Sequence, residues 1–564
     1  MATRKQEIKI RNKFGWKLYK DSNIQLWFSG YLVGEKNVED ILLELVTLSY
    51  SLNIDIEKLS KWVSSLSGNF ACVVKFSDNS CFLAVDKICS IPVFDAVKEN
   101  KYAVSNYAPY LKEILDIGSN DINLQSLLEV SMSGFTIDDK TIYNNINRLA
   151  AGECVFWNNG KRYKKYYYTY FPCKNSSNNY TELKSEFAAI CLTTIKKLIK
   201  SVNGRQIVVP LSAGNDSRLI VSCLKELSYE NVICFTYGRY GNYEVNTSKK
   251  VADMLGYKWV YIQDVLREKR NFFKSTIYNS YIEMFESYAS VPNVQDIYEI
   301  YTLKTRNIID TDAVIVNGNS GDFISGGHIP DVLELDKEFL LDDSTNWTLF
   351  LDKHYSLWSK LRTNVNDKLI VSQLLKSISK RLKYQKQDTV FLYSVIESME
   401  CIGRQSRLVA NQQRAYDFIG HEWRLPLWSE DFLSFWEGVP PEYKVNQALY
   451  KDVLMENNWG GVWKDINVNN KSIRPYSLYF FRLFAKFVMS PFGKKKWHRI
   501  ERNIFVYWMH PSYARAVVPY LSVLFDRRGE KNTNSWMSDQ FVKRNGFNDV
   551  VSVSNKVWLL HKYK

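Results

Sequence analysis

The stretch VVPLSAGNDSRLIVSCL, residues 208–224, decides the fold. It begins with residues that are apolar on both faces, as in a buried parallel strand. Small residues follow, and a helical pattern begins at about Ser217. Such a loop lets backbone N–H groups approach an anion at the positive end of a helix dipole. The Walker spacing G-x-x-x-x-G-K-S/T is absent, and an ordinary strand–turn–helix junction is the alternative interpretation.

Strands and helices alternate on both sides of this stretch. Helical patterns cover residues 183–202 and 243–256, and apolar strand-like runs cover 231–238, 258–264 and 313–316. This alternation predicts a parallel sheet with helices on both faces. From about residue 332 onward the pattern is mostly helical.

The first 170 residues have a different pattern. Short apolar or alternating runs, such as 69–76 and 81–87, are separated by Gly, Asn, Asp or Ser, which predicts strands. Two helical patterns, at 38–52 and 122–134, interrupt them. We therefore expect a layered α+β half, joined to the parallel sheet through the polar stretch 173–182.

A second glycine-rich loop, residues 317–328, follows the apolar run AVIV. The carboxyl ends of parallel strands are where ligands bind. Asp322 is therefore well placed to hold Mg²⁺ against pyrophosphate, and Asp216 can cap its helix or hold the same metal ion. A glycine-rich surface loop is the alternative.

The two loops resemble motifs of one enzyme group. SAGNDS at 212–217 resembles the S-G-G-x-D-S pyrophosphate loop of the ATP-pyrophosphatase superfamily, with Ala213 in place of the first Gly. GNSGDFISGG at 318–327 resembles the G-x-G-x-D-E-x-x-x-G-G segment of asparagine synthetases, with Phe323 in place of the Glu. The resemblance implies an ATP- and Mg²⁺-dependent ligase that adenylates a carboxylate and transfers an amine to it. By this resemblance the ATP and pyrophosphate ligands are Ser212, Ala213, Gly214, Asn215, Asp216, Ser217, Gly318, Ser320 and Gly321, and the Mg²⁺ ligands are Asp216 and Asp322.

Two further segments resemble the same family. GHEWRLPLW, residues 420–428, is similar to E-x-R-x-P-F-L-D, which implies that Glu422 lies beside the acyl-adenylate and assists amine attack. A structural Glu422 paired with Arg424 is the alternative. NKSIRP, residues 470–475, is similar to R-x-K-x-x-x-x-P, which implies that Lys471 neutralises developing charge. The run from Lys451 to Leu454 looks like the family's K-x-x-L-R helix.

The first half also resembles the family, in GNFA at 68–71 and IPVF at 91–94. The resemblance implies a degenerate glutaminase-like domain over residues 1–172, with an Ntn-hydrolase-like α+β sandwich. It implies an adenine nucleotide α hydrolase-like synthetase domain over 180–564, with a basic helical C-terminal region. The glutaminase needs a cysteine directly after the initiator Met, but residue 2 is Ala2 and the first cysteine is Cys72. We therefore expect no glutamine hydrolysis, and an amine supplied by ammonia, an amino compound or a partner glutaminase.

The substrate expectation also comes from resemblance. Residues 318–330 and 422–428 look like asparagine-synthetase-like proteins of bacterial O-antigen and capsule biosynthesis, which are thought to convert uronic acid carboxylates to amides. Arg404, Arg407 and Arg414 precede the second segment, and guanidinium groups suit carboxylates and sugar phosphates. An ordinary polar helix is the alternative for them. Two other functions stay open: a peptide or small-metabolite amide synthetase, like lasso-peptide cyclase or β-lactam synthetase, and a non-catalytic scaffold.

The net charge of +14 is uneven, because residues 490–564 alone contribute +9. No zinc-finger or RNA-recognition pattern accompanies this charge, so we expect no nucleic-acid partner. The run LYFFRLFAKFVM, residues 478–489, carries Arg482 and Lys486 one turn apart, which suggests peripheral contact with a membrane surface; a solvated basic face is the alternative.

No secretory signal and no apolar run of about 18 residues occurs, so we expect a cytoplasmic protein, at most associated with the inner membrane surface. The nine cysteines form no C-x-x-C pair, so we expect them to be reduced and buried.

Overall fold

The structure is a computed structural model. It describes residues 5–50, 54–173, 179–330, 333, 335, 337–339, 346–383, 390–464, 466, 476–509, 512–529 and 533–562.

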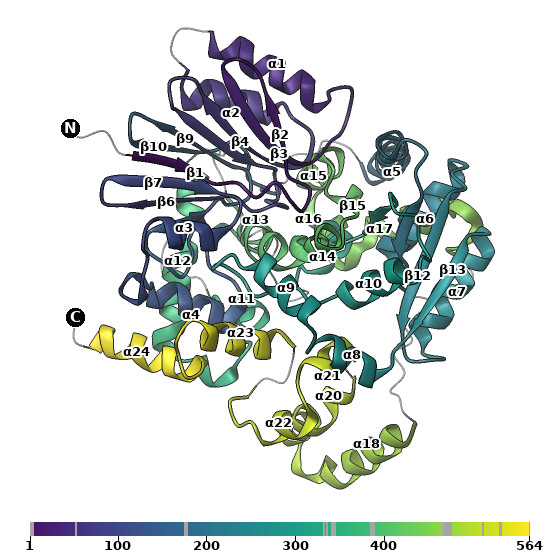
Figure 1. Cartoon of the computed structure of the whole chain (residues 1–564). Helices are drawn as coiled ribbons and strands as arrows, with labels where there is room; N and C mark the ends of the chain where they lie inside the picture. Colours follow the sequence, from purple (N-terminus) through teal and green to yellow (C-terminus); the bar gives the residue numbers. More distant parts are fainter. Residues whose placement is uncertain are drawn as a thin grey trace.

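The first half contains two sheets. Four strands pair in the order β1-β7-β6-β8, namely Lys5–Ile8, Lys101–Ser105, Phe94–Lys98 and Ile146–Arg148. Six antiparallel strands pair in the order β10-β9-β5-β4-β3-β2, namely Lys161–Tyr166, Glu153–Asn158, Cys81–Val85, Gly68–Phe76, Ile24–Leu32 and Lys17–Lys20. Helices α1 (Val38–Ser49) and α2 (Ile56–Ser64) cover the outer face of the larger sheet (Figure 1). Asn37 and Asp55 cap these helices, each accepting a backbone N–H of the first turn.

The second half is built on a five-stranded parallel sheet in the order β13-β12-β11-β14-β15. The strands are Lys258–Gln263, Val232–Gly238, Ile207–Pro210, Val314–Val316 and Glu422–Arg424. Its first connecting helices are α5 (Tyr180–Val202), α6 (Asn215–Glu226) and α7 (Tyr243–Leu255). The apolar stretch at 207–209 is fully buried at the centre of the sheet, as its sequence predicts. β15 is an addition to the sequence-based expectation, because its charged ends, Glu422 and Arg424, leave no apolar run to mark a buried strand.

Helices make up most of the rest of the described chain. Between β13 and β15 they are α8 Leu266–Phe272, α9 Thr276–Phe285, α10 Ile297–Thr305, α11 Thr348–His354, α12 Asn364–Leu382, α13 Leu392–Glu400, a π-helix Cys401–Val409, a short 3₁₀ turn Ala410–Gln413 and α14 Arg414–Ile419. After β15 they are α15 Glu430–Gly438, α16 Pro441–Lys444, α17 Ala448–Asn457, α18 Tyr476–Met489, α19 Lys494–Ile500, α20 Val506–Met509, α21 Ser512–Val517, α22 Tyr520–Phe525, α23 Thr533–Arg544 and α24 Val550–Lys562. In the first half, α3 Ala108–Ile114 and α4 Leu124–Ser133 complete the set. None of the described helices is long and apolar enough to cross a membrane.

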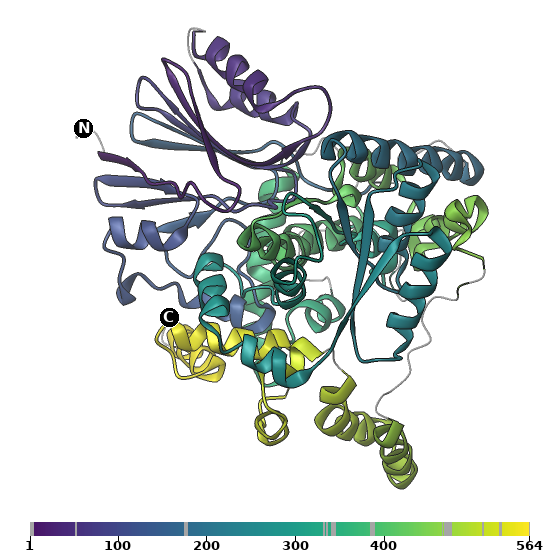
Figure 2. The same ribbon diagram turned by 45° about the vertical axis from the view of Figure 1, so that its right-hand side comes forward.

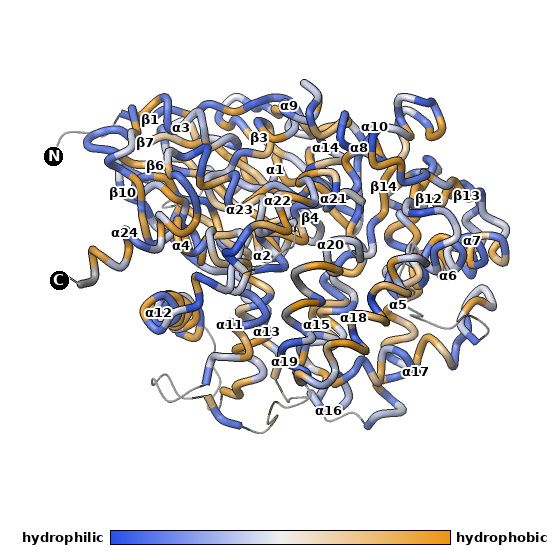
Figure 3. The backbone as a smooth tube through the Cα atoms, turned by 90° about the horizontal axis from the view of Figure 1, so that it is seen from below, coloured by the Kyte–Doolittle hydropathy of each residue, from blue (hydrophilic) through white to orange (hydrophobic). Residues whose placement is uncertain are grey.

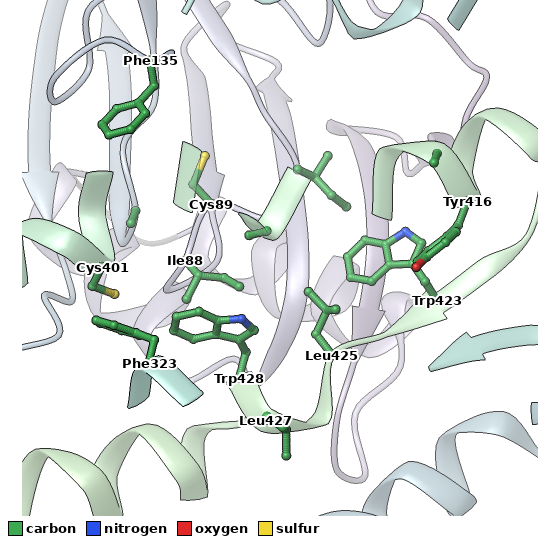
Figure 4. Packing of buried hydrophobic residues seen from close by; sticks show 14 of the residues in the cluster. Ile88, Cys89, Phe135, Phe323, Cys401, Tyr416, Trp423, Leu425, Leu427 and Trp428 are labelled. Carbon is green, nitrogen blue, oxygen red and sulfur yellow. The ribbon is translucent and has the colours of Figure 1, made fainter. Parts of the chain in front are cut away.

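One continuous apolar core joins the two halves. It contains Ile88 and Cys89 from the first half and Trp428 and Phe323 from the second, and Figure 4 shows Ile88 beside the Trp428 ring. A smaller core lies between α1, α2 and the six-stranded sheet. The division into residues 1–172 and 180–564 stays a prediction, since the packing continues across it.

The predicted fold class is confirmed: a layered α+β half precedes a parallel sheet, and a helical half follows. Eight of the nine cysteines are buried free thiols, and Cys173 is half-buried.

Candidate active site

A cavity of about 1460 Å³ opens at the carboxyl ends of β11, β12 and β14. Its walls include the loop after β11, the last residues of β12 and the loop after β14. This is the edge of a parallel sheet at which ligands bind, and both glycine-rich loops of the sequence meet there.

The first loop leads into a helix end that is open to an anion. Gly214 is the N-cap of α6 and supplies no side-chain hydrogen bond to its first turn. The nearby hydroxyls serve the loop itself: Ser217 Oγ accepts the backbone N–H of Ser212 at 3.0 Å, and Ser212 Oγ accepts that of Gly214 at 3.1 Å. Because Gly214 leaves the first-turn N–H groups of α6 without a side-chain cap, they can bind an anionic ligand such as phosphate.

The second loop presses against the first because it is made of small residues. A Cβ placed on Gly321 would lie 2.5 Å from Cγ of Asp216, and one on Gly318 would lie 2.9 Å from the backbone N of Ser217. These distances are shorter than any van der Waals contact. Glycine is therefore required at both positions for the loops to touch.

Asp216 and Asp322 lie at this contact. The backbone N–H of Asp322 donates to Oδ2 of Asp216 at 2.9 Å, and the Tyr450 hydroxyl donates to Oδ1 of Asp216 at 3.0 Å. Burial, followed by the charge of Asp322, raises the pKa of Asp216 to about 7. Burial works against the charge of Asp322, but its hydrogen bond from His328 holds its pKa below the usual range.

The two carboxylates suit Mg²⁺, which is commonly held by one or two carboxylates together with substrate phosphates. The Asp322 side chain is 58% exposed and lines the cavity, so its oxygens are accessible from it. Among the described residues, no group of three or more His, Cys, Asp or Glu could hold a metal ion alone. Asp216 and Asp322 would therefore supply part of the coordination shell of a Mg²⁺ ion.

A buried carboxylate, Glu400, organises the cationic wall of the cavity. His328 Nδ1 contacts its Oε1, His354 Nε2 lies 3.2 Å from its Oε2, and Lys353 Nζ and Arg404 Nη1 lie at 3.4 and 3.6 Å. Burial opposes its charge, but the hydrogen bonds from the two histidines hold the pKa of Glu400 well below its usual range. Glu400 thus fixes His328 and Arg404, which both line the cavity.

A second buried carboxylate, Asp296, positions the loop after β14. The Tyr416 hydroxyl donates to Asp296 Oδ2 at 2.8 Å and accepts from Asn317 Nδ2 at 2.7 Å. Tyr237, at the end of β12, donates to Asp296 Oδ1 at 2.7 Å. Asp296 has a φ of +64°, a strained conformation for a residue other than glycine. This network ties the second loop to β12 and α14.

The far end of the cavity is basic. It is lined by Arg239, which follows β12, and by Trp508 and Arg515 of the C-terminal basic region. Arg515 is only 5% exposed, and its Nε is buried without a hydrogen-bond partner among the described residues. Burial, followed by the charge of Arg239, lowers the pKa of Arg515 to about 10. Two acids, Glu244 and Asp264, also line the cavity, and Asp264 forms an ion pair with the buried Lys269 at 2.6 Å.

The structure gathers most of the predicted ligands at the cavity. Those that line it are Ser212, Ala213, Gly214, Asn215, Asp216, Ser217, Gly318, Ser320, Asp322 and Arg404. Gly321 lies within the second loop, against Asp216. Lys471 lies outside the described residues.

The placement predicted for Glu422 is wrong. β15 runs parallel to β14, with Glu422 opposite Val314, so Glu422 stands at the amino end of its strand and at the edge of the sheet away from the cavity. Its Oε2 lies 3.0 Å from Arg205 Nη2 and 3.2 Å from Arg424 Nη2. The alternative, a structural Glu422 paired with Arg424, describes this geometry.

Two of the three predicted arginines are also away from the cavity. Arg407 is fully buried and donates to the backbone carbonyl of Asp138 in the first half. Arg414 is buried against Asp417, at 3.6 Å, and against Met284. Arg407 differs from Arg404 because residues 401–409 form a π-helix, in which positions three apart do not share a face as they do in an α-helix. Arg414 lies beyond this π-helix, in α14.

Several cavity residues were not predicted as site residues. Lys451, Gln447 and Lys464 line it, and Tyr450 holds Asp216 from outside its lining. Lys451 belongs to the K-x-x-L run, which was the available signal. Phe323, which replaces the family's Glu, is buried against Tyr170 and Trp428 and so points into the core.

Comparison with known proteins places this site within a family segment. Residues 199–457 match the family model described as asparagine synthase, somewhat less than half of the chain. No curated protein matches the chain.

Similar solved structures are remote. An ammonia-dependent NAD synthetase from Campylobacter jejuni in complex with nitrate shares 13% identity over 41% of this chain and 95% of its own, with a TM-score of 0.20. A glutamine phosphoribosylpyrophosphate amidotransferase from B. subtilis, complexed with ADP and GMP, shares 10% sequence identity over 54% of this chain and 63% of its own, with a TM-score of 0.19. An allosteric regulatory enzyme of purine biosynthesis shares 12% sequence identity over 70% of this chain and 80% of its own, also with a TM-score of 0.19. Likenesses at this level support no statement about activity.

Both loops that meet at the cavity lie within the matched residues. The segment that contributes both loops to the candidate active site, residues 199–457, is therefore similar to the asparagine synthase family.

Proposed function

We propose that this chain is an ATP-dependent ligase that forms an amide bond by adenylating a carboxylate. The observation that carries the proposal is the meeting of the uncapped end of α6 with Asp216 and Asp322 at one cavity. The α6 end would hold phosphate, and the two carboxylates would hold Mg²⁺. Mg²⁺, when bound, would neutralise charge on the pyrophosphate that leaves.

The basic end of the cavity supports an acidic acceptor. Arg239 and Arg515 offer charge to a carboxylate or a phosphate, and Trp508 offers an apolar face to a sugar ring. We propose a uronic acid of a surface polysaccharide, or its precursor, as the substrate. The amine that attacks the activated carboxylate would come from ammonia, an amino compound or a partner glutaminase.

We propose that the first half does not hydrolyse glutamine. Residue 2 is Ala2. The cysteines of residues 1–172, namely Cys72, Cys81, Cys89 and Cys154, are all buried, and burial raises the pKa of each thiol. A protonated, buried thiol is a poor nucleophile. Release of glutamate from glutamine by the purified chain would overturn this part of the proposal.

Pyrophosphate release tests the ligase proposal. The chain is mixed with ATP, Mg²⁺, ammonia and a panel of acids: glucuronate, galacturonate and their nucleoside-diphosphate forms. We expect release of pyrophosphate and AMP with at least one acid, and none without it. If ATP binds but no acid elicits pyrophosphate, the uronic acid assignment fails, and peptide or small-metabolite acids are tested next. If ATP does not bind at all, the chain is a scaffold and the ligase proposal fails.

Substitution of Arg515 distinguishes binding of the acid from binding of ATP. We expect Arg515→Gln to raise the KM for the acid about tenfold or more and to leave the KM for ATP within twofold. Arg527→Gln is the matched control, because Arg527 is an exposed arginine of the same basic region that does not line the cavity. Equal effects of both substitutions would show that Arg515 does not contact the acid.

A further inference from the structure

Helix α18, residues Tyr476–Met489, exposes a stripe of large apolar side chains. Phe480, Phe481, Phe484 and Phe487 are 68%, 68%, 69% and 79% exposed, and Val488 is 47% exposed. Their spacing of i, i+1, i+4, i+7 and i+8 places them on one side of the helix. A contiguous apolar patch of this kind on a protein surface marks an interaction site.

The opposite side of α18 faces the protein, and it carries Arg482, one of the two charged residues of the helix. Leu478, Arg482, Ala485 and Met489 are the half-buried positions. Arg482 Nε donates to Glu501 at 2.7 Å, and the guanidinium lies 5.7 Å from the centre of the Trp497 ring. For Arg482 this reverses the usual arrangement of a surface helix, in which charged residues face water. Arg482 therefore pairs with Glu501 inside the protein, contrary to the expectation that it faces a membrane.

Basic residues surround the apolar stripe. Lys486, Lys494 and Lys496 are exposed, and Phe492 beside them is 58% exposed. Residues 476–500 contain no Asp or Glu. The nearest acid along the chain, Glu501, pairs with Arg482. The surface made by α18 and the turn into α19 is thus apolar at its centre and basic at its margin.

This surface lies apart from the rest of the molecule. Figures 1 and 2 show α18 at the lower edge, away from the three sheets, and Figure 3 views that side from below. Nothing in the described part of the chain covers the phenylalanine stripe.

We propose that α18 and the turn into α19 dock on the surface of an anionic lipid bilayer. The apolar stripe enters the boundary between head groups and acyl chains, and the lysines contact anionic head groups. The charge pattern favours this occupant over a second copy of the chain, because two identical basic margins would repel each other. At 14 residues the helix is about 21 Å long, shorter than the roughly 30 Å of a bilayer core, so it lies on the membrane.

Vesicle flotation with the full chain tests this proposal. Vesicles are made of phosphatidylcholine alone or of phosphatidylcholine mixed with phosphatidylglycerol. We expect binding to the mixed vesicles that falls as salt rises, and at least tenfold weaker binding to the neutral ones. The double variant Phe484→Asp/Phe487→Asp should lose binding to both by at least tenfold. Lys494→Gln/Lys496→Gln should lose the preference for phosphatidylglycerol.

Leu43→Asp is the matched control, because Leu43 is 67% exposed on α1 at the other end of the molecule. It should bind as the unaltered chain does. All these positions are exposed, so the variants should keep the thermal midpoint of the unaltered chain. The proposal is overturned if the unaltered chain fails to bind mixed vesicles, or if the phenylalanine variant binds them equally well. It is also overturned if the chain is a dimer that the phenylalanine variant dissociates without any vesicle binding.

Discussion

The two edges of the parallel sheet carry similar residues with different roles. At the carboxyl edge, Glu400 is 2% exposed and holds His328 and Arg404 at the cavity. At the amino edge, Glu422 has a side chain that is 54% exposed and pairs with Arg205 and Arg424. Both are glutamates beside guanidinium groups. Strand direction, rather than residue type, decides which of them belongs to the site.

The largest effect should come from the carboxylates between the two loops. We expect Asp322→Asn and Asp216→Asn each to lower acid-dependent pyrophosphate release roughly 10²–10³-fold, because charge on the leaving pyrophosphate loses its counter-ion. Asp312→Asn is the control, since Asp312 is exposed and precedes β14 at the amino edge. Activity within threefold of the unaltered chain in either Asp322→Asn or Asp216→Asn would remove that residue from the site.

Contact between the loops can be broken without removing a charge. Alanine at Gly321 would place its Cβ 2.5 Å from Asp216 Cγ, so the loops must separate. We expect ATP affinity, measured by calorimetry, to fall about thirtyfold, or roughly 2 kcal/mol. Gly438→Ala is the control, because a Cβ there meets nothing within 4 Å. Unchanged affinity in Gly321→Ala would show that the loops need not touch for ATP to bind.

Replacing Glu400 by a neutral residue should free the cationic side chains that it holds at the cavity, His328 and Arg404. In Glu400→Gln we expect about a tenfold loss of kcat/KM and a lower thermal midpoint, because three nearby cations lose their buried counter-charge. Initial rates and thermal unfolding of the same samples provide the measurement. A lower midpoint with unchanged kcat/KM would limit Glu400 to stability.

The same cluster should make stability depend on pH. Burial opposes the charge of His328, but its hydrogen bonds with Asp322 and Glu400 raise its pKa from 6.5 to about 9. A raised pKa contributes stability that is complete below pH 6.5 and is lost as the pH rises through 9. In magnesium-free buffer, the unaltered chain should lose about 2 kcal/mol more than His328→Gln over this range. Parallel unfolding curves for the two proteins at pH 6.5 and 9.5 would contradict this.

The smallest effect should come from the amino edge. Glu422→Gln removes a partly exposed ion pair, so pyrophosphate release should stay within twofold and stability should fall by about 0.5 kcal/mol at most. Kinetics alongside Glu400→Gln give the comparison directly. A hundredfold loss in Glu422→Gln would mean that the role implied by the family resemblance holds despite the observed geometry.

Sequence reasoning was sufficient where local pattern and chemistry agree. The alternation of strands and helices gave the parallel sheet, and the small residues of 212–217 and 317–322 marked the loops at its edge. It failed where position depends on tertiary structure. The direction of β15 moved Glu422 away from the cavity, and the π-helix turned Arg407 away from the face of Arg404. Neither Glu400 nor Asp296 could be predicted, because their importance comes from burial among partners distant in sequence.

The continuous core has a consequence for the first half of the chain. Trp428 and Phe323 pack in one cluster with Ile88 and Cys89, and Arg407 donates to Asp138 across the same junction. A chain shortened to begin near residue 180 would leave these aromatic rings and a buried guanidinium facing water. The first half therefore has a structural role of its own: it keeps these rings and this guanidinium of the second half out of water.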